Sequence, residues 1–293
     1  TDPDPRGFAA LAERAVAMAK VVPEDPFGGL PDSFDPPRDP GPLDLFDPTE
    51  PSAEQLIERA AAAEDAALAV KGITNSEGAD AGWGRVRIAL AMSNGFAGSY
   101  ARSSHSLSCT ALAGTGTGME RDYEWSSVVH LSDLDDPATI GRRAAEKTLA
   151  RLNPVRAKTA RIPVVYDPRV SASLLGHLTS AINGAAVARG TSFLRDAMGT
   201  QVLPKGMVVR DDPTRRRGLR SRPFDGEGMA GGPRALVDDG VLTSWVLDWR
   251  SARQLGLAST GHASRGTGGP PGPATTNLWL EPGAVTPAAL MAD

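Results

Sequence analysis

LGHLTSAINGAAVARGTS, residues 175–192, is the stretch that decides how this chain is interpreted. It reads as a buried helix that runs into a glycine turn, and it contains His177, one of only 4 histidines in the sequence. Helices that carry histidine and end at a glycine turn hold the metal in zinc hydrolases. The first question is therefore whether His177 is a metal ligand or whether this helix is a scaffold without chemistry.

The neighbours of His177 do not complete a helical zinc motif. Such a motif needs a second histidine one helical turn away and a glutamate beside the first, because the glutamate acts as the general base. Here Leu178 follows His177, and Ala181 stands four residues on. The remaining histidines are isolated in sequence: His105, His130 and His262. A site assembled from all four stays open, and a structural role for each histidine is the favoured interpretation.

Helical patterns precede the quoted stretch. Residues 6–22 place apolar side chains at helical spacing, which predicts an amphipathic helix. A second helix is predicted to begin at Ser52, where Gln55 completes a capping box, and to end at Gly72. A third is predicted over residues 136–152, which open on an Asp-Pro pair suited to a helix start.

Strand patterns alternate with these helices. Residues 73–114 read as strands separated by glycine turns, and residues 161–168 (RIPVVYDP) read as a short buried strand. Residues 235–248 (ALVDDGVLTSWVLD) predict a hairpin whose turn lies at Asp239–Gly240. Residues 274–283 predict one more strand.

These elements indicate an α+β fold in two parts. The first part covers residues 1–153 and contains a proline-rich connection over residues 21–51, and the second covers residues 154–293. The chain starts at Thr1 and stops inside a segment that reads as a helix just begun. We therefore expect a piece of a longer protein, with a truncated N-terminal domain.

Composition excludes several classes of function. With 41% apolar and 23% charged residues the chain has the composition of a globular protein. The net charge of -4 argues against nucleic acid as the main partner. Cys109 is the single cysteine, so an internal disulfide and a cysteine-rich zinc site are excluded, and a reducing cytoplasm is compatible. No apolar run approaches the roughly 18 residues of a membrane span.

Several long segments, in this order, resemble one family. They are GMERDYEWSS (118–127), IGRRAAEKTLARLNP (140–154), LLGHLTSAINGAAVARGTSFL (174–194), RGLRSRPFDGEG (217–228), ALVDDGVLTSWVLD (235–248) and STGHASRG (259–266). The chain is similar over nearly its whole length to the PmbA/TldD family, and most similar to its PmbA branch, also called TldE. The resemblance implies an N-terminal α+β domain and a C-terminal domain built on a curved, barrel-like antiparallel sheet. It also implies a cytoplasmic metalloprotease family that acts on small or unfolded peptides.

The resemblance also bears on the opening question. The TldD branch carries H-E-x-x-x-H on a helix ahead of a G-T-S turn, with a further cysteine ligand near its C-terminus. When the shared turn Gly190–Ser192 is aligned, the two histidines fall on Leu175 and Ser180 and the glutamate falls on Gly176. Leucine and glycine offer no side-chain ligand, and serine is a poor ligand for zinc. By this alignment His177 does not occupy a ligand position, and the motif is degenerate.

The resemblance then implies a non-catalytic subunit that pairs with a TldD-type subunit, as a heterodimer or a homodimer-like assembly. Zinc is expected in that partner, with no cofactor, catalytic residue or metal ligand in this chain. A peptide is the expected substrate, and neither a membrane nor a nucleic acid is expected as a partner. Two alternatives stay open. One is an autonomous peptidase with an unconventional site that uses His177 or His262. The other is a nucleic-acid-linked regulator, which the family's older description as a modulator of DNA gyrase suggests.

The arginine run RRRGLRSRPFDGEG, residues 215–228, is the remaining unusual feature. We predict that Arg220, Arg222 and Asp225 belong to a structured loop that faces a peptide channel or the partner subunit. Arginine binds carboxylates through two parallel hydrogen bonds, which suits a peptide terminus or an acidic surface. His177 and His262 are further candidates for substrate or partner contact. A phosphate-binding patch and a solvated loop with internal ion pairs stay open as alternatives.

Overall fold

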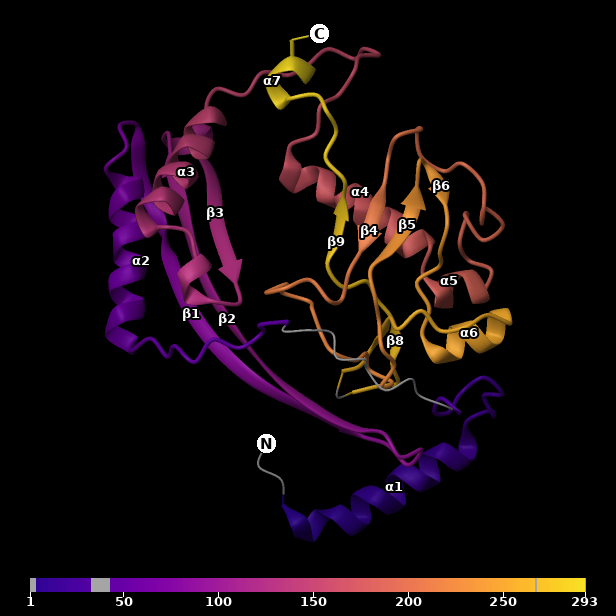
Figure 1. Ribbon diagram of the computed structural model, residues 1–293. Helices are drawn as coiled ribbons and strands as arrows, with labels where there is room; N and C mark the ends of the chain where they lie inside the picture. Colours follow the sequence, from indigo (N-terminus) through magenta and orange to yellow (C-terminus); the bar gives the residue numbers. More distant parts are fainter. Residues whose placement is uncertain (1–3, 33–42, 267, 293) are drawn as a thin grey trace.

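A computed structural model describes residues 4–32, 43–266 and 268–292 (Figure 1). Residues 33–42 of the predicted proline-rich connection lie outside the described residues. So do residues 1–3 and 293, at the outer ends of the two predicted parts, and residue 267.

The first two predicted helices are confirmed. A short 3-10 turn, η1 (Pro5–Gly7), leads into α1 (Phe8–Val21), which buries none of its residues. The second helix, α2 (Ala53–Leu68), begins after Ser52 with the predicted capping box. The Ser52 hydroxyl accepts a hydrogen bond from the Gln55 N–H, and the Gln55 side chain accepts one from the Ser52 N–H.

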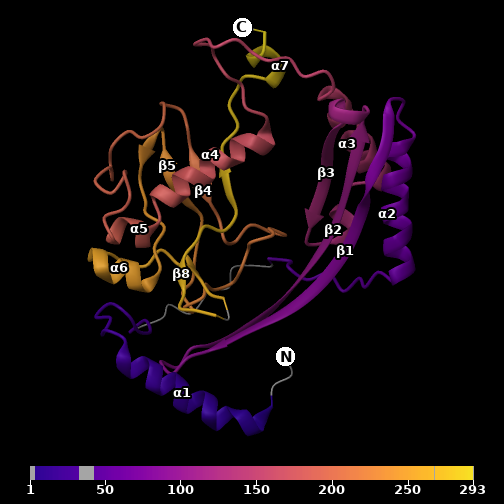
Figure 2. The same cartoon turned by 180° about the vertical axis from the view of Figure 1, so that it is seen from behind.

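The N-terminal region is built on one antiparallel sheet of β1 (Ile73–Ala91), β2 (Ala97–Ala113) and β3 (Glu120–Val128), in that order. A 3-10 turn, η2 (Gly116–Gly118), connects β2 to β3, and η3 (Leu131–Asp133) follows β3. Helices α2 and α3 (Pro137–Ala150) cover one face of the sheet, while its other face turns toward the C-terminal region (Figures 1 and 2). The long β1–β2 hairpin continues past α2 and ends beside α1.

The two covering helices approach each other closely because α3 presents Gly141 to α2. A β-carbon added to Gly141 would lie 2.0 Å from the Ala63 carbonyl oxygen, so only glycine fits there. The predicted N-cap is also confirmed, since the Asp136 carboxylate accepts a hydrogen bond from the Thr139 N–H. Small residues thus fix the spacing of the layer that supports the sheet.

The C-terminal region combines helices with short strands. Its helices are α4 (Pro168–Ala181), α5 (Gly184–Ala188), α6 (Trp249–Leu255) and α7 (Pro287–Leu290). Its strands are β4 (Val209–Asp211), β5 (Arg234–Asp238), β6 (Val241–Leu242), β7 (Ala263–Ser264), β8 (Gly272–Pro273) and β9 (Leu278–Leu280). An antiparallel sheet of order β6-β5-β4-β9 packs against α4 through a core that includes Leu178, Ile182 and Leu236, and β7 pairs separately with β8.

The mixed α+β class predicted from the sequence is confirmed, and the sheets of the described residues are not closed into a barrel. The predicted hairpin turn is confirmed as well. Asp239 and Gly240 both adopt positive φ, +46° and +80°, as the turn between β5 and β6 requires. A β-carbon on Gly240 would lie 2.3 Å from the Leu203 carbonyl oxygen, so that turn also packs against its neighbour too closely for a side chain.

The prediction of a buried strand over residues 161–168 is wrong. Residues 161–167 belong to no described helix or strand and are exposed, with Ile162 at 65% and Val164 at 63%, and Pro168 already begins α4. A short apolar run predicts burial only if a neighbouring strand lies beside it, and periodicity does not reveal the neighbour. The run leads directly into α4, whose N-cap is Asp167.

Candidate functional site

Helix α4 carries the three positions that align with the metal motif, Leu175, Gly176 and Ser180. Leu175 packs against the C-terminal core, whereas Gly176 and Ser180 are exposed. The Ser180 hydroxyl donates to the Gly176 carbonyl oxygen at 2.9 Å. His177 is exposed, and its ring has no partner in the part of the chain that the structure describes. The outer face of α4 offers one imidazole and one hydroxyl, without a converging set of ligands.

His262 is a buried histidine whose ring nitrogens both have partners. Its Nε2 lies 3.0 Å from the Asp211 Oδ2 atom, and its Nδ1 lies 2.8 Å from the Thr260 hydroxyl. Asp211 also accepts hydrogen bonds from the Thr276 N–H at 2.7 Å and from the Thr276 hydroxyl at 2.6 Å. The His262 ring therefore holds the segment around residue 260 to Asp211 of β4, which in turn holds Thr276, and the ring is not available to a substrate.

The other two histidines lie in the N-terminal region. His105 is 1% exposed and lies 3.4 Å from the Asp47 carboxylate, and burial lowers the pKa of its ring. His130 lies 3.0 Å from the Asp44 carboxylate. Across residues 4–32, 43–266 and 268–292, no three histidine, cysteine, aspartate or glutamate side chains are grouped so that they could hold a metal ion.

The first three arginines of the arginine run are held by neighbours. Arg216 and Arg217 both contact the Asp44 carboxylate, at 2.8 and 2.7 Å, and Arg217 also contacts Asp133 at 2.9 Å. The Arg215 guanidinium lies over the Trp279 ring at 5.7 Å from its centroid. These residues tie the C-terminal region to the N-terminal segments around residues 44 and 133, and they do not form a free phosphate-binding patch.

The second half of the run lines a cleft of about 670 Å³ between the two regions. We name it the arginine cleft. Strands β1 and β2 form one wall, and loops of the C-terminal region form the other. Its lining residues are Val86, Ile88, Ala89, Leu90, Tyr100, Arg102, Leu219, Arg220, Arg222, Phe224, Asp225, Gly226, Ser264, Arg265, Gly266, Ala274, Thr275 and Thr276. The structure thus brings Arg220, Arg222 and Asp225 together, and it places His177 and His262 outside this lining.

Asp225 organises the loop at the cleft. Its carboxylate accepts hydrogen bonds from the N–H groups of Glu227, Met229 and Ala263, at 2.8, 2.9 and 2.9 Å. Burial raises the pKa of this carboxyl, and the three N–H groups act in the opposite direction. Because both oxygens are occupied, Asp225 is a positioning residue.

Arg222 is likewise part of the framework. Its guanidinium donates to the Ala263 carbonyl oxygen at 2.9 Å and to the Gly261 carbonyl oxygen at 3.4 Å. Burial lowers the pKa of Arg222, and the negative charge of Asp225 acts in the opposite direction. The Nε atom is buried and has no acceptor among the described residues.

Aromatic rings form the apolar part of the arginine cleft. Phe224 meets Tyr100 and Phe96 edge-on, with centroids 5.3 and 5.0 Å apart. A β-carbon on Gly98 would lie 2.7 Å from the Phe224 ring, so β2 uses glycine where the loop docks. Phe224 therefore anchors the arginine run to the β1–β2 hairpin.

None of the four arginines that line the cleft forms an ion pair with a carboxylate of the described residues. Arg102 donates to the Leu219 carbonyl oxygen, and Arg265 donates to the Gly226 carbonyl oxygen at 3.0 Å. The Arg220 side chain is exposed and has no partner in the described residues. The cleft therefore keeps an excess of positive charge.

Glu227 was not identified from the sequence, although it lies two residues beyond Asp225. It is 4% exposed and accepts a hydrogen bond from the Trp249 N–H at 2.7 Å, at the start of α6. Burial raises its pKa to about 7, and Asp225 and Asp248 act in the same direction. An acidic residue flanked by glycines was the only sequence signal.

A smaller hollow of about 210 Å³ adjoins the arginine cleft. It is lined by Ser180 on α4 and by Asn183, among others, and it shares Ala274 and Thr275 with the larger cleft. The Thr275 main-chain N–H donates to no acceptor in the described residues. Residues 274–275 therefore lie between the arginine cleft and the outer face of α4.

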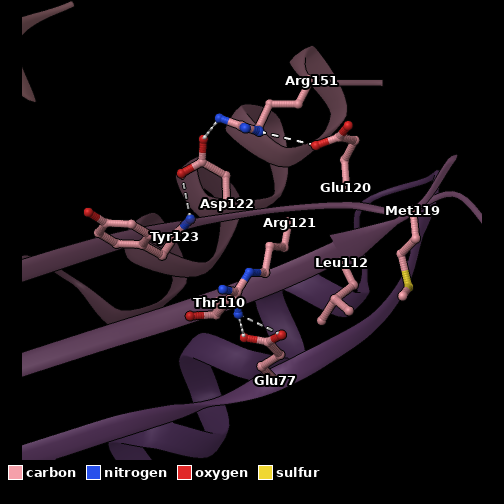
Figure 3. A pocket seen from close by; sticks show the side chains of 9 residues that line it. All are labelled: Glu77, Thr110, Leu112, Met119, Glu120, Arg121, Asp122, Tyr123 and Arg151. Atoms are coloured by element: carbon pink, nitrogen blue, oxygen red, sulfur yellow. Dashed lines mark hydrogen bonds and ion pairs between the residues drawn. The ribbon is translucent and has the colours of Figure 1, made fainter. Parts of the chain in front are cut away.

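A second cleft, of about 560 Å³, lies along β3 and is drawn in Figure 3. We name it the paired cleft; it is lined by Glu77, Thr110, Leu112, Met119, Glu120, Arg121, Asp122, Tyr123 and Arg151. Arg121 pairs with Glu77 at 2.7 Å, and Arg151 lies 3.4 Å from Glu120 and 3.7 Å from Asp122. Asp122 also binds Arg169 of α4 at 2.8 Å, and that hydrogen bond lowers the pKa of the Asp122 carboxyl.

Comparison with known proteins assigns the chain. Residues 46–152 match the PmbA/TldA metallopeptidase central domain, and residues 159–293 match the PmbA/TldA metallopeptidase C-terminal domain. The metalloprotease PmbA of Escherichia coli O157:H7 is 40% identical over 268 residues, which is 90% of this chain. The chain belongs to the PmbA/TldD family. The predicted resemblance is thereby confirmed.

Other members of the PmbA/TldD family share the fold. TldE from Thermococcus kodakarensis superimposes with a TM-score of 0.83 at 21% identity, over 99% of this chain. Haemophilus influenzae has both a metalloprotease PmbA homolog, 35% identical over 86% of this chain, and a metalloprotease TldD homolog, 26% identical over 51% of it. The chain spans 59% of the length of the Escherichia coli relative, 56% of the Haemophilus PmbA homolog and 66% of the Thermococcus TldE chain.

The residues of this PmbA/TldD chain do not fit a zinc ion at α4. Leu175 and Gly176 offer no ligand atom, and the Ser180 hydroxyl is already bonded to the main chain. The buried His262 ring is held by Asp211 and Thr260, so it is not free to turn toward α4.

None of the helices in the described ranges combines the length and the apolar character that crossing a membrane requires.

Proposed function

We propose that this chain is the PmbA/TldE-type, non-catalytic subunit of a two-subunit metalloprotease in which a TldD-type partner holds the zinc. The observation that carries the proposal is helix α4, where Leu175, Gly176 and Ser180 stand in place of two ligands and a base. A zinc-bound water needs three protein ligands and an open position to attack a peptide bond. With one imidazole, at His177, and no carboxylate beside it, α4 does not supply that set of side chains.

The proposed substrates are small or unfolded peptides, and the proposed location is the cytoplasm. The arginine cleft supports a role in holding peptide, because it joins a positively charged wall to an apolar floor of Tyr100 and Phe224. Arg220 is the exposed contact residue of this site, and Arg222 and Asp225 position the loop that presents it. The occurrence of relatives of both names in one organism supports a TldD-type partner.

The experiment is to purify the full-length protein and a TldD-type subunit separately, then to incubate each alone and both together with an unfolded peptide. We expect cleavage from the mixture and none from this subunit alone. Elemental analysis of this subunit, prepared without added metal or chelator, is expected to find no stoichiometric zinc. One tightly bound zinc per chain, or full peptidase activity without the partner, would overturn the proposal and favour an autonomous peptidase.

A further inference from the structure

The arginine cleft has a charge imbalance that the fold itself does not neutralise. Its lining contains four arginines and one acidic residue. That acid, Asp225, already accepts three main-chain N–H groups. Because an unpaired guanidinium group in a concave, partly apolar site attracts an anion, the imbalance points to a negatively charged ligand.

Arg220 is the arginine that a ligand can reach. Its side chain is exposed and without a partner in the described residues, while its backbone is held firmly. The Arg220 N–H donates to the Asn277 side chain at 3.0 Å, and Asn277 also donates to the Ser221 hydroxyl at 2.8 Å. Because the backbone is already fixed, less conformational entropy is lost when the free guanidinium group forms hydrogen bonds to a ligand.

We propose that the arginine cleft binds the C-terminal carboxylate of an extended peptide, with Arg220 donating the hydrogen bonds to it. The proposal rests on the function proposed above and names the chemical group of the substrate that this chain recognises. A carboxylate matches the two parallel N–H groups that a guanidinium presents.

The surroundings of Arg220 favour a peptide chain as the owner of that carboxylate. Val86, Ile88 and Tyr100 supply apolar surface for side chains next to the terminus. Thr275 lies between this cleft and the small hollow beside Ser180, and its main-chain N–H is free to pair with an extended strand. A peptide anchored at Arg220 therefore has a path past Thr275 to the outer face of α4.

The rest of the charge distribution disfavours a nucleic acid at this site. Arg216 and Arg217 are already held by Asp44 and Asp133, so the arginine run does not present a continuous row of cations. The chain as a whole carries a net charge of -4. A phosphate backbone needs several phosphate contacts in a row, whereas a single carboxylate needs one guanidinium group.

The test compares two forms of one short, fluorescently labelled alanine–leucine peptide, one with a free C-terminal carboxylate and one with a C-terminal amide. Fluorescence anisotropy is measured with this chain alone, without partner or metal. We expect the carboxylate form to bind about tenfold more tightly than the amide, because a charge-assisted hydrogen bond is lost in the amide. Added salt is expected to reduce that difference.

Arg220→Gln is the test variant, and Arg189→Gln is its matched control. The Arg189 side chain is also exposed and without a partner in the described residues, but it lies outside the cleft lining. We expect Arg220→Gln to bind both peptides equally weakly and Arg189→Gln to keep the preference for the carboxylate. Circular dichroism melting of both variants checks that each remains folded.

Three outcomes would overturn the proposal. The first is equal binding of the carboxylate and amide peptides by the wild-type chain. The second is displacement of the labelled peptide by an oligonucleotide at the same concentration at which an unlabelled carboxylate peptide displaces it. The third is an Arg220→Gln variant that binds the TldD-type subunit more weakly but keeps the preference for the carboxylate peptide. That result would make the cleft a subunit interface. Failure of the cleavage experiment with a retained carboxylate preference would count against the proposed subunit role only.

Discussion

The two clefts of this protein are of similar size and both are lined by arginine, yet their charges are arranged in opposite ways. In the paired cleft, Arg121 and Arg151 each face a carboxylate within 4 Å. In the arginine cleft, no arginine faces a carboxylate at that distance in the described residues, and those with partners donate to main-chain carbonyl oxygens. The paired cleft is electrostatically satisfied by its own side chains, and the arginine cleft is not.

This difference separates charges that support the fold from charges available to a ligand. An ion pair such as Arg169–Asp122 connects α4 to β3, so its loss is expected to affect stability. An unpaired exposed arginine contributes little to folding, so its loss is expected to affect binding. Substitutions at matched positions in the two clefts therefore test the comparison.

The largest expected effect is that of Asp225→Ala in the arginine cleft. The substitution leaves the N–H groups of Glu227, Met229 and Ala263 buried without an acceptor. We expect the free energy of unfolding to fall by about 4 kcal/mol, as measured by urea denaturation. Asp196→Ala serves as the control, because Asp196 is 89% exposed. Equal urea midpoints for the two variants would show that the Asp225 contacts do not stabilise the loop.

Glu227 is expected to make stability depend on pH in the neutral range. Its pKa is about 7 in the folded protein, above the ordinary value of 4.5. The folded state therefore binds the proton more strongly than the unfolded state, and stability falls as pH rises from about 5 to 7 and then levels off. We expect a loss on the order of 2 kcal/mol over this range in the wild type, and a flatter profile for Glu227→Gln.

The measurement is a series of urea midpoints between pH 5 and pH 8. Glu13→Gln, on the exposed helix α1, controls for removal of a carboxylate elsewhere. If Glu227→Gln retains the full pH dependence, another group is responsible for it.

A smaller effect is expected for Asp122→Asn in the paired cleft. The change removes the ion pairs with Arg169 and Arg151 but leaves side chains that water can reach. We expect a loss of about 1 kcal/mol at neutral pH. Arg169 lowers the pKa of the Asp122 carboxyl in the folded protein. The ion pairs therefore stabilise the fold fully above the ordinary pKa of an aspartate, and this stabilisation disappears as the pH falls through the lowered pKa of the folded state.

Wild type and Asp122→Asn are thus expected to approach equal stability in acid, which urea titrations at neutral and acidic pH can follow. A difference between the two proteins that stays constant with pH would show that the ion pairs are not its cause.

The smallest effects on stability are expected for single exposed arginines. Arg121→Gln breaks an exposed ion pair with Glu77. We expect the free energy of unfolding to fall by no more than about 0.5 kcal/mol, and by less at high salt. Arg220→Gln is expected to leave the melting temperature unchanged while it removes the carboxylate preference. A melting temperature lowered more by Arg220→Gln than by Arg121→Gln would contradict the distinction between the two clefts.

Much of the local structure was predictable from residues next to one another in the chain. The capping box at Ser52 and Gln55, the helix start at Asp136 and the turn at Asp239–Gly240 all depend on short-range chemistry, and all three are confirmed. The exposed run at residues 161–168 was predicted wrongly, because burial depends on a neighbour that the run does not specify. The strands of the C-terminal region are also shorter than their patterns suggested, since β6 spans two residues.

The sequence by itself determined the family and the α+β class, because these follow from which residues stand in which order. Only the tertiary structure decided what each arginine of the run does. Residues 216 and 217 pair with Asp44 and Asp133, which precede them by more than 80 positions, whereas Arg220 meets no carboxylate in the described residues. Charge pairing depends on distances of a few ångströms between residues far apart in the chain, and those distances exist only once the chain has folded.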